Sequence, residues 1–544
     1  MPAAQRGGIA RVAAALARLD GRRGAGAATG LGVAATLALP PWYVLPLLAL
    51  SFTGLVWLLD GAAVAPRPLR RAAAVGFCFG LGYFGVGLHW IAEAFLVDPV
   101  RHGWMIPFAI GGLSALLALF PAAACAFAVA ARRRFAVGGA GRVLLLAAAW
   151  VVAEWLRGWV LTGFPWHLAG YAWSFSPVMT QSAALFGAFG LSLLTVVVAA
   201  MPAVLGDPRP GRRDVLAFAA AVLLVPALAI GGSLRLASAP DYAATPAGTP
   251  ANPALVGGIR LRIVQAGIPQ RLKWQPELRR ENLMRHIALS RQPAAAEPTL
   301  LVWPETAVPY FLADDPAARA IAAAAAPPGG LLLTGSARYE GPPGDGRRYY
   351  NSALAIADDG SVRAVYDKVH LVPFGEYVPL GDLLPLDKLV AGAGDFTAGR
   401  RLLTLDLPGV PPVGPLICYE AIFPGAVTAS DRRPAWLLNL TNDGWFGAGA
   451  GPRQHLAIAA MRAVEEGLPL VRAAGTGISA VIDPYGREAA RLGVGEIGIL
   501  DSGLPQPLAP TPFADYGNLL PGLIILLTIS LSFMWIADES ANDF

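Results

Sequence analysis

The sequence predicts a multi-pass α-helical membrane protein, with about eight transmembrane helices, that also carries an α/β domain. Two observations support this fold class. The 544 residues are 55% hydrophobic and only 15% charged, whereas about 25% of the residues in an ordinary soluble domain are charged. The charges are also unevenly placed, because 52 of the 283 residues from 235 to 517 are charged, against 27 of the other 261. We therefore expect a membrane part and a more polar globular part.

The membrane part is predicted from long segments that contain no Asp, Glu, Lys or Arg. A transmembrane helix needs about 20 predominantly apolar residues to cross a hydrocarbon core of about 30 Å. Pro40-Pro41 divides the first charge-free window into two. The candidate spans are then 27–39, 42–60, 72–96, 104–131, 143–161, 180–205, 214–234 and 518–536. The first of them is shorter than a full span.

The arginines predict the orientation of these spans. Fifteen arginines precede the first span or follow the second, fourth and sixth, whereas the alternate loops hold only Arg101 and Arg157. The positive-inside rule places the arginine-rich side in the cytoplasm. The segment after the seventh span is then expected on the outer face, and the acidic C-terminus inside. The basic and then apolar N-terminus is interpreted as an uncleaved signal anchor, because further spans follow it.

Three domains are predicted from this pattern. Residues 1–234 are expected to form a membrane domain with about seven transmembrane helices, and residues 518–544 a last helix with a short cytoplasmic tail. Residues 235–517 alternate short apolar runs with helical stretches, which is typical of an α/β domain. The expected strands are 259–264, 299–303, 330–335, 352–357, 415–418 and 435–439, the expected helices 275–290 and 453–466, and the expected linker 237–254.

The composition excludes several function classes. The net charge of +5 is small for this length and predicts no nucleic-acid partner. The three cysteines cannot build a disulfide framework, and no two of them have metal-ligand spacing. Cys78 and Cys125 lie in predicted spans and are interpreted as buried apolar thiols. Cys418 is therefore the one cysteine outside the predicted spans.

Cys418 ends an apolar run that stops at a polar turn. Residue type alone favours a small buried side chain there. The alternative is a nucleophile at a strand end, where N–H groups of the turn face a developing oxyanion. Glu305 and Lys368 also follow apolar runs, and Glu376 lies eight residues after the lysine. A buried carboxylate suits a general base, and an ammonium stabilises a thiolate, but spacing alone does not join these residues.

Other ionisable residues are interpreted as structural. Glu154 and Arg157, three residues apart in the span 143–161, are predicted to pair near the outer interface, with contact to a phospholipid head group as the alternative. His370 and His455 fall in the polar domain, where solvated or packing positions are favoured for them.

An ordered set of motifs resembles a known family. Trp303-Pro-Glu305, Asp367-Lys368 with Pro373-Phe-Gly-Glu376, and Ile417-Cys418-Tyr-Glu420 are similar to the Glu-Lys-Cys motifs of the nitrilase, or carbon-nitrogen hydrolase, superfamily. With seven spans before the polar domain and one after it, the chain resembles the apolipoprotein N-acyltransferase family, its membrane-integral branch. Further motifs fit the same family: Thr162–Trp166, Val264–Gln270, Lys273-Trp274, Tyr349–Ser352 and Asn439–Gly447.

The resemblance implies a four-layer αββα sandwich on the periplasmic side of a bacterial inner membrane. It implies that Glu305 takes the thiol proton while Cys418 attacks a glycerophospholipid, phosphatidylethanolamine by family resemblance, and forms a thioester. The acyl chain then passes to the N-terminal amine of an S-diacylglyceryl-cysteine apolipoprotein, the last step of lipoprotein maturation. Lys368 and the Tyr419 N–H would hold the oxyanion.

The resemblance also names supporting residues. Glu376, Tyr419 and Glu420 match positions that support the triad, and Trp274 matches a position on a mobile loop near the active site. A monomer without metal, nucleotide or other cofactor is expected. The alternative is a membrane-tethered nitrilase-type amidase that hydrolyses small amides. A transporter or sensor whose outer domain only binds a ligand is disfavoured, because charge-free spans with one ionic pair offer little for a polar substrate path.

Overall fold

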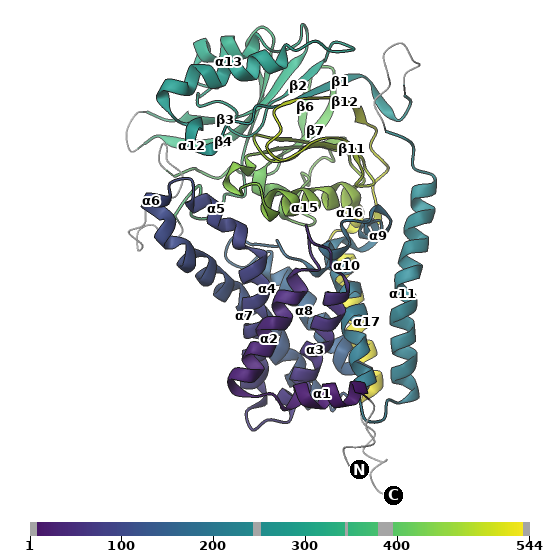
Figure 1. Cartoon of the computed structure of the whole chain (residues 1–544). Helices are drawn as coiled ribbons and strands as arrows, with labels where there is room; N and C mark the ends of the chain where they lie inside the picture. Colours follow the sequence, from purple (N-terminus) through teal and green to yellow (C-terminus); the bar gives the residue numbers. More distant parts are fainter. Residues whose placement is uncertain (1–7, 243–251, 343–345, 379–394, 537–544) are drawn as a thin grey trace, which may run out of the picture. The chain divides into compact units, whose positions relative to one another are not determined.

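The computed structural model describes residues 8–242, 252–342, 346–378 and 395–536 (Figure 1). The chain divides into two compact units. The first comprises Met1–His89, Met105–Ala237 and Asp515–Phe544, and the second comprises Trp90–Trp104 and Ser238–Ala514. The middle of the predicted linker 237–254 and the acidic tail predicted at the C-terminus lie outside the described residues.

The first unit is helical. Its longer helices are α1 (Gly8–Arg18), α2 (Gly21–Thr36), α3 (Pro46–Ala63), α4 (Pro68–Gly87), α7 (Ile106–Arg134), α8 (Gly139–Arg157), α10 (Ala183–Ala200), α11 (Arg212–Ala237) and α17 (Leu519–Ser532). Each predicted span overlaps one of α2, α3, α4, α7, α8, α10, α11 and α17. Five helices of the described ranges are long and apolar enough to cross a membrane, or six if a bent pair counts as one span. The long apolar helices confirm the helical membrane class, while the number eight stays a prediction.

Small residues allow two of these helices to pack backbone against backbone. A Cβ atom on Gly32 of α2 would lie 2.0 Å from the carbonyl oxygen of Phe79 in α4. In the opposite direction, a Cβ atom on Gly82 of α4 would lie 2.1 Å from the carbonyl oxygen of Thr29. Close contact at small residues is a common way for apolar helices to associate when no water has to be expelled.

The structure differs from the predicted span 72–96. Helix α4 ends at Gly87, and the chain bends by 51° before the segment His89–Phe95. The following residues belong to the second unit, where the Trp90 indole donates a hydrogen bond of 2.9 Å to Gln454 and its ring packs edge-on against Phe446. A run without charged residues indicates that a segment is buried, but it does not show whether the segment is buried in the membrane or inside a globular domain.

The second unit contains two six-stranded sheets. The first has the order β12-β1-β2-β3-β4-β5 and the second β11-β10-β9-β8-β7-β6. The strands are β1 (Leu255–Gln265), β2 (Leu300–Val302), β3 (Leu331–Glu340), β4 (Arg348–Ala357), β5 (Val362–Asp367), β6 (Leu405–Leu407), β7 (Val410–Ile417), β8 (Trp436–Thr441), β9 (Leu470–Ala474), β10 (Ser479–Ile482), β11 (Glu488–Leu492) and β12 (Gly498–Pro505). The six strands expected from the sequence overlap β1, β2, β3, β4, β7 and β8.

Alternating side chains make these sheets two-sided. In β2, Leu301 packs in a core with helices α13 (Arg279–Ser290) and α14 (Pro316–Ala323), whereas Leu300 and Val302 pack in the core between the sheets. In β8, Leu437 packs beneath α15 (Ala450–Glu466), and Leu438 enters the core between the sheets. Figure 1 shows α13 and α15 on opposite sides of the sandwich. The layers confirm the predicted αββα fold, since successive strand residues face opposite sides.

The predicted site residues lie at or just after strand ends, where their side chains are buried. Glu305 follows β2 by three residues, Lys368 comes directly after β5, and Cys418 comes directly after β7. The first two belong to one sheet and the third to the other.

Candidate active site

Cys418 occupies a strained backbone position. Its φ is +51°, the left-handed region that side chains other than glycine rarely adopt, and it begins the short 3-10 helix η7 (Cys418–Ile422). Such a conformation costs on the order of 1–3 kcal/mol and persists only where the surroundings hold it. The residue is 7% exposed. The turn therefore presents the thiol at the end of β7 in a mostly buried place.

Lys368 joins the two predicted carboxylates. Its Nζ lies 2.8 Å from Oε2 of Glu376 and 3.7 Å from Oε1 of Glu305, and all three side chains are buried. Oε2 of Glu376 also accepts a hydrogen bond of 2.8 Å from the main-chain N–H of Val372. The stronger ion pair is thus the one with Glu376, which leaves Glu305 the more loosely held carboxylate.

Asn351 connects the same two carboxylates and was missed as a site residue by sequence reasoning. Its Nδ2 donates hydrogen bonds of 2.7 Å to Oε1 of Glu305 and 2.7 Å to Oε1 of Glu376. The main-chain N–H of Lys368 donates to the carbonyl oxygen of Asn351 at 2.8 Å. The motif Tyr349–Ser352 was the signal that could have pointed to it.

The charges of this cluster act on the Cys418 thiol. Burial and the negative charge of Glu305 raise the pKa of Cys418 to about 12, and the charge of Lys368 counteracts part of the rise. Burial disfavours the Lys368 ammonium, but Glu376 and Glu305 outweigh burial and raise its pKa. At neutral pH the resting site therefore holds a neutral thiol beside a charged lysine. A base has to remove the thiol proton before attack.

Glu420 connects the Cys418 turn to the segment that carries Lys368. One of its oxygens accepts from the Tyr366 hydroxyl at 2.8 Å and the Val369 N–H at 2.7 Å, and the other from the Ile417 N–H at 2.7 Å. Burial raises the pKa of Glu420 to about 7 although these donors oppose the rise. Its neighbour Tyr419 is buried and packs edge-on against Phe423.

Two family models match most of the chain. The model of the apolipoprotein N-acyltransferase N-terminal domain matches residues 31–201, and the carbon-nitrogen hydrolase model matches residues 260–509. The apolipoprotein N-acyltransferase of Rhodopseudomonas palustris is 43% identical over 97% of this chain and 98% of its own length. That of Bradyrhizobium diazoefficiens is 44% identical over 92% of this chain and 93% of its own.

The chain belongs to the apolipoprotein N-acyltransferase family. The family resemblance inferred from the ordered motifs is thereby confirmed. Among solved structures, an amidase from Nesterenkonia sp. is similar over 46% of this chain and 92% of its own, at 24% identity and a TM-score of 0.34.

His455, for which the sequence favours a solvated or packing position, lies in a buried polar network behind the Cys418 turn. In this member of the apolipoprotein N-acyltransferase family, Nε2 of His455 lies 3.1 Å from the carbonyl oxygen of Cys418. Asp443 accepts a hydrogen bond of 2.7 Å from Arg472, and the Arg472 charge outweighs burial and lowers the pKa of Asp443 to about 2. His455 lies on α15, far along the chain from Cys418, so no local signal could have found it.

Trp274 comes directly after the short helix α12 (Gln270–Lys273), and its side chain is 37% exposed. The preceding Lys273 is buried, and its Nζ lies 3.2 Å from the main-chain carbonyl oxygen of Glu305. The structure therefore brings Lys273 of the Lys273-Trp274 motif to the Glu305 turn, whereas Trp274 itself is exposed. In the part of the chain that the structure describes, no group of three His, Cys, Asp or Glu side chains is arranged to hold a metal ion.

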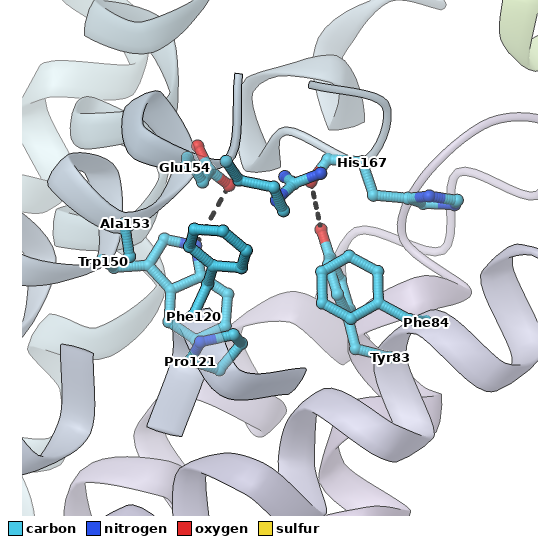
Figure 2. Close-up of a pocket in the computed structure, with 9 residues that line it drawn as sticks. Tyr83, Phe84, Phe120, Pro121, Trp150, Ala153, Glu154 and His167 are labelled. Atoms are coloured by element: carbon cyan, nitrogen blue, oxygen red, sulfur yellow. Dashed lines mark hydrogen bonds between the residues drawn. The ribbon is translucent and has the colours of Figure 1, made fainter. Parts of the chain in front are cut away.

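Glu154 and Arg157 of α8 bond to the segment that follows their own helix, and Figure 2 shows Glu154 beside Trp150. Glu154 accepts hydrogen bonds from the Trp150 indole at 3.0 Å and the Ala169 N–H at 2.9 Å. Arg157 donates to the carbonyl oxygens of Phe164 at 2.6 Å and His167 at 2.9 Å. One of these bonds reaches Phe164 in the Thr162–Trp166 motif. The predicted pairing of Glu154 with Arg157 stays a prediction, as does its alternative, contact with a phospholipid head group.

Proposed function

We propose that the protein transfers an acyl chain from a glycerophospholipid to the N-terminal amine of a diacylglyceryl apolipoprotein through a thioester on Cys418. The observation that carries this proposal is the buried Glu305–Lys368–Glu376 cluster, whose charges act on the thiol of Cys418. The membership of the apolipoprotein N-acyltransferase family supplies the substrate classes.

In the first half-reaction, the Cys418 thiol proton passes to Glu305 as the sulfur attacks the ester carbonyl carbon. The negative charge that develops on the carbonyl oxygen is held by the Lys368 ammonium and the Tyr419 N–H. The C–O bond then breaks, the leaving alkoxide takes the proton from Glu305, and lysophospholipid departs. Fixed donors aimed at a developing oxyanion are worth about 3–4 kcal/mol each in comparable sites.

In the second half-reaction, the free amine of the S-diacylglyceryl-cysteine attacks the thioester carbonyl. Glu305 accepts a proton from the amine, the C–S bond breaks, and the thiolate regains that proton as the amide forms. The same base therefore serves both steps, so no group has to be re-protonated from solvent between them. Glu376, Asn351 and Glu420 hold Lys368, Glu305 and the nucleophile turn in place.

The proposed setting is a bacterial inner membrane, with the catalytic domain on the periplasmic face and phosphatidylethanolamine as the donor. The fifteen-to-two distribution of arginines supports this orientation. A monomer is proposed, since every residue of the proposed mechanism comes from one chain.

Intact-mass analysis of the full-length protein in micelles containing phosphatidylethanolamine tests the function. We expect an acyl adduct that is absent in Cys418→Ala and present in Cys125→Ala, a matched control because Cys125 is also buried. A diacylglyceryl-cysteine peptide should discharge the adduct and become an amide. Rapid discharge by water without amide would instead favour the nitrilase-type amidase. Lys368→Ala should insert into the membrane without forming the adduct.

A further inference from the structure

A buried lysine outside the predicted triad contacts the turn that carries the base. Nζ of Lys273, at the end of α12, donates hydrogen bonds to the main-chain carbonyl oxygen of Glu305 at 3.2 Å and to Oγ1 of Thr306 at 3.0 Å. The residue is 4% exposed. Neither acceptor is a carboxylate, and among the residues that the structure describes the ammonium has no direct ion pair of the kind that usually compensates burial.

The turn that Lys273 contacts is strained and tightly enclosed. Thr306 has a φ of +41°, which costs on the order of 1–3 kcal/mol in a residue with a side chain. From the other side, the N–H of Gly335 donates to the carbonyl oxygen of Pro304 at 3.1 Å. A Cβ atom on Gly335 would lie 2.5 Å from the Cα of Glu305. The direction of the Glu305 side chain thus depends on β3 at one side and on Lys273 at the other.

The Lys273 ammonium also lies in the field of both reacting groups. Burial lowers the pKa of Lys273 to about 8, and the negative charges of Glu305 and Cys418 oppose this fall. The charge of Lys273 also acts on His286 of α13, but burial lowers the pKa of that imidazole to about 4, so it is neutral near pH 7. When the thiol proton moves to Glu305, the negative charge moves from the carboxylate to the sulfur, and Lys273 attracts it in both places.

We propose that Lys273 is a positioning residue that holds the Glu305–Thr306 turn. Its ammonium also stabilises the negative charge that Glu305 carries at rest and that Cys418 carries after losing its proton. The inference deepens the proposed acyl transfer and rests on it. Burying an ammonium costs free energy, and an apolar side chain of similar size would fill the same space without that cost. We therefore assign the positioning role to the charge of Lys273 as well as to its packing. Trp274 follows Lys273 directly in the chain, so the buried Lys273 also anchors the exposed Trp274.

Single-turnover thioester formation in the full-length protein tests this assignment. Phosphatidylethanolamine micelles provide the donor, and rate constants are measured by quenched intact mass between pH 5.5 and 9. We expect Lys273→Met to lower the rate constant by about tenfold to hundredfold, the loss typical of a misplaced catalytic group. It should also move the acid limb of the pH–rate profile upward while KM for the phospholipid stays within a factor of about two. Lys273→Arg, which keeps the charge, should recover part of the rate.

Arg271→Met is the matched control, because Arg271 is an exposed cation two residues away on the same short helix. It should leave the rate and its pH profile unchanged. If Lys273→Met does not fold, Thr306→Val, which removes one hydrogen-bond acceptor of Nζ, should lower the rate in the same direction by a smaller factor. An unchanged rate and pH profile in folded Lys273→Met would overturn the assignment, as would a loss confined to KM or to thermal stability. Absence of any thioester in the unaltered protein would instead refute the proposed function.

Discussion

Nε2 of His455 lies 3.1 Å from the main-chain carbonyl oxygen of Cys418, the residue proposed as the nucleophile. A carbonyl oxygen only accepts hydrogen bonds, so Nε2 carries the proton. Burial and the neighbouring Arg472 lower the pKa of His455, while its contacts with Asp443 oppose this fall. On the other side of the ring, Nδ1 lies 3.1 Å from Oδ1 of Asp443 and 3.1 Å from Nη2 of Arg472. The network supports the strained φ of Cys418 from inside the domain.

His455→Leu should therefore lower the rate of thioester formation more than it lowers the melting temperature. Loss of one buried hydrogen bond costs about 1–3 kcal/mol, which corresponds to about tenfold to hundredfold if the cost falls on the active turn. His455→Gln can place an amide donor where Nε2 lies and should retain most of the rate. Equal rates in the Leu and Gln variants would contradict this view. Single-turnover mass analysis and thermal unfolding of the same samples provide the two measurements.

The raised pKa of Cys418 predicts slow alkylation of the resting enzyme. With a pKa of about 12 the thiolate fraction rises about tenfold for each pH unit up to pH 10, without a plateau. An ordinary cysteine, with a pKa of about 8.5, would level off above pH 9. Mass-resolved modification of Cys418 by iodoacetamide between pH 6.5 and 10 measures this. Lys368→Met removes the charge that stabilises the thiolate and should slow the reaction at every pH. A plateau below pH 9 would show that the resting thiol is already activated.

Gly335→Ala should disable the base while the fold persists. The added methyl group would lie 2.5 Å from the Cα of Glu305 and 2.6 Å from the N of Thr306, both main-chain atoms that cannot rotate away. Overpacking of this kind costs about 1–3 kcal/mol of stability, but a base displaced by an ångström loses about a hundredfold in rate. Gly257→Ala in the same sheet has open space at the Cβ position and serves as the control. Thioester formation in Gly335→Ala within twofold of the control would refute the argument.

The lowered pKa of Asp443 predicts that the free energy of unfolding decreases at acidic pH. Its pKa is about 2 in the folded protein, against about 3.9 in an unfolded chain. A group with a depressed folded pKa stabilises the fold above its unfolded pKa, and the contribution is lost as the pH falls through the folded value. The difference between the two pKa values corresponds to about 2–3 kcal/mol in the free energy of unfolding, and this contribution is fully present above pH 5.

The comparison of wild type with Asp443→Asn tests this in detergent by thermal unfolding from pH 7 to 2.5. Because the variant leaves Arg472 buried without its carboxylate, its melting temperature should be well below that of the wild type at pH 7. The difference should shrink below pH 4, where Asp443 takes up a proton in the unfolded wild-type chain while it is still ionised in the folded protein. A difference that stays constant down to pH 2.5 would mean that Asp443 does not titrate as proposed.

Much of the architecture follows from short-range sequence patterns. Charge-free windows locate the apolar helices, because a membrane span needs about 20 predominantly apolar residues. This requirement is local, so it is visible in each segment without knowledge of the others. Strands such as β2 and β8 are visible because they are short apolar runs bounded by turn residues. The ordered motifs around Glu305, Lys368 and Cys418 indicate the family, and the family comparisons confirm it.

Contacts between distant parts of the chain were decided only by the tertiary structure. The segment after α4 looks like the end of a membrane span, but Trp90 bonds to Gln454 in the second unit. Asn351, His455 and Lys273 reach the site from β4, α15 and α12. Asn351 and Lys273 lie in family motifs, but the local sequence does not indicate which side chains they contact. Sequence by itself determined where the chain is apolar and which residues can do chemistry. The fold decided which of them meet, because a hydrogen bond or ion pair depends on distances that local patterns do not encode.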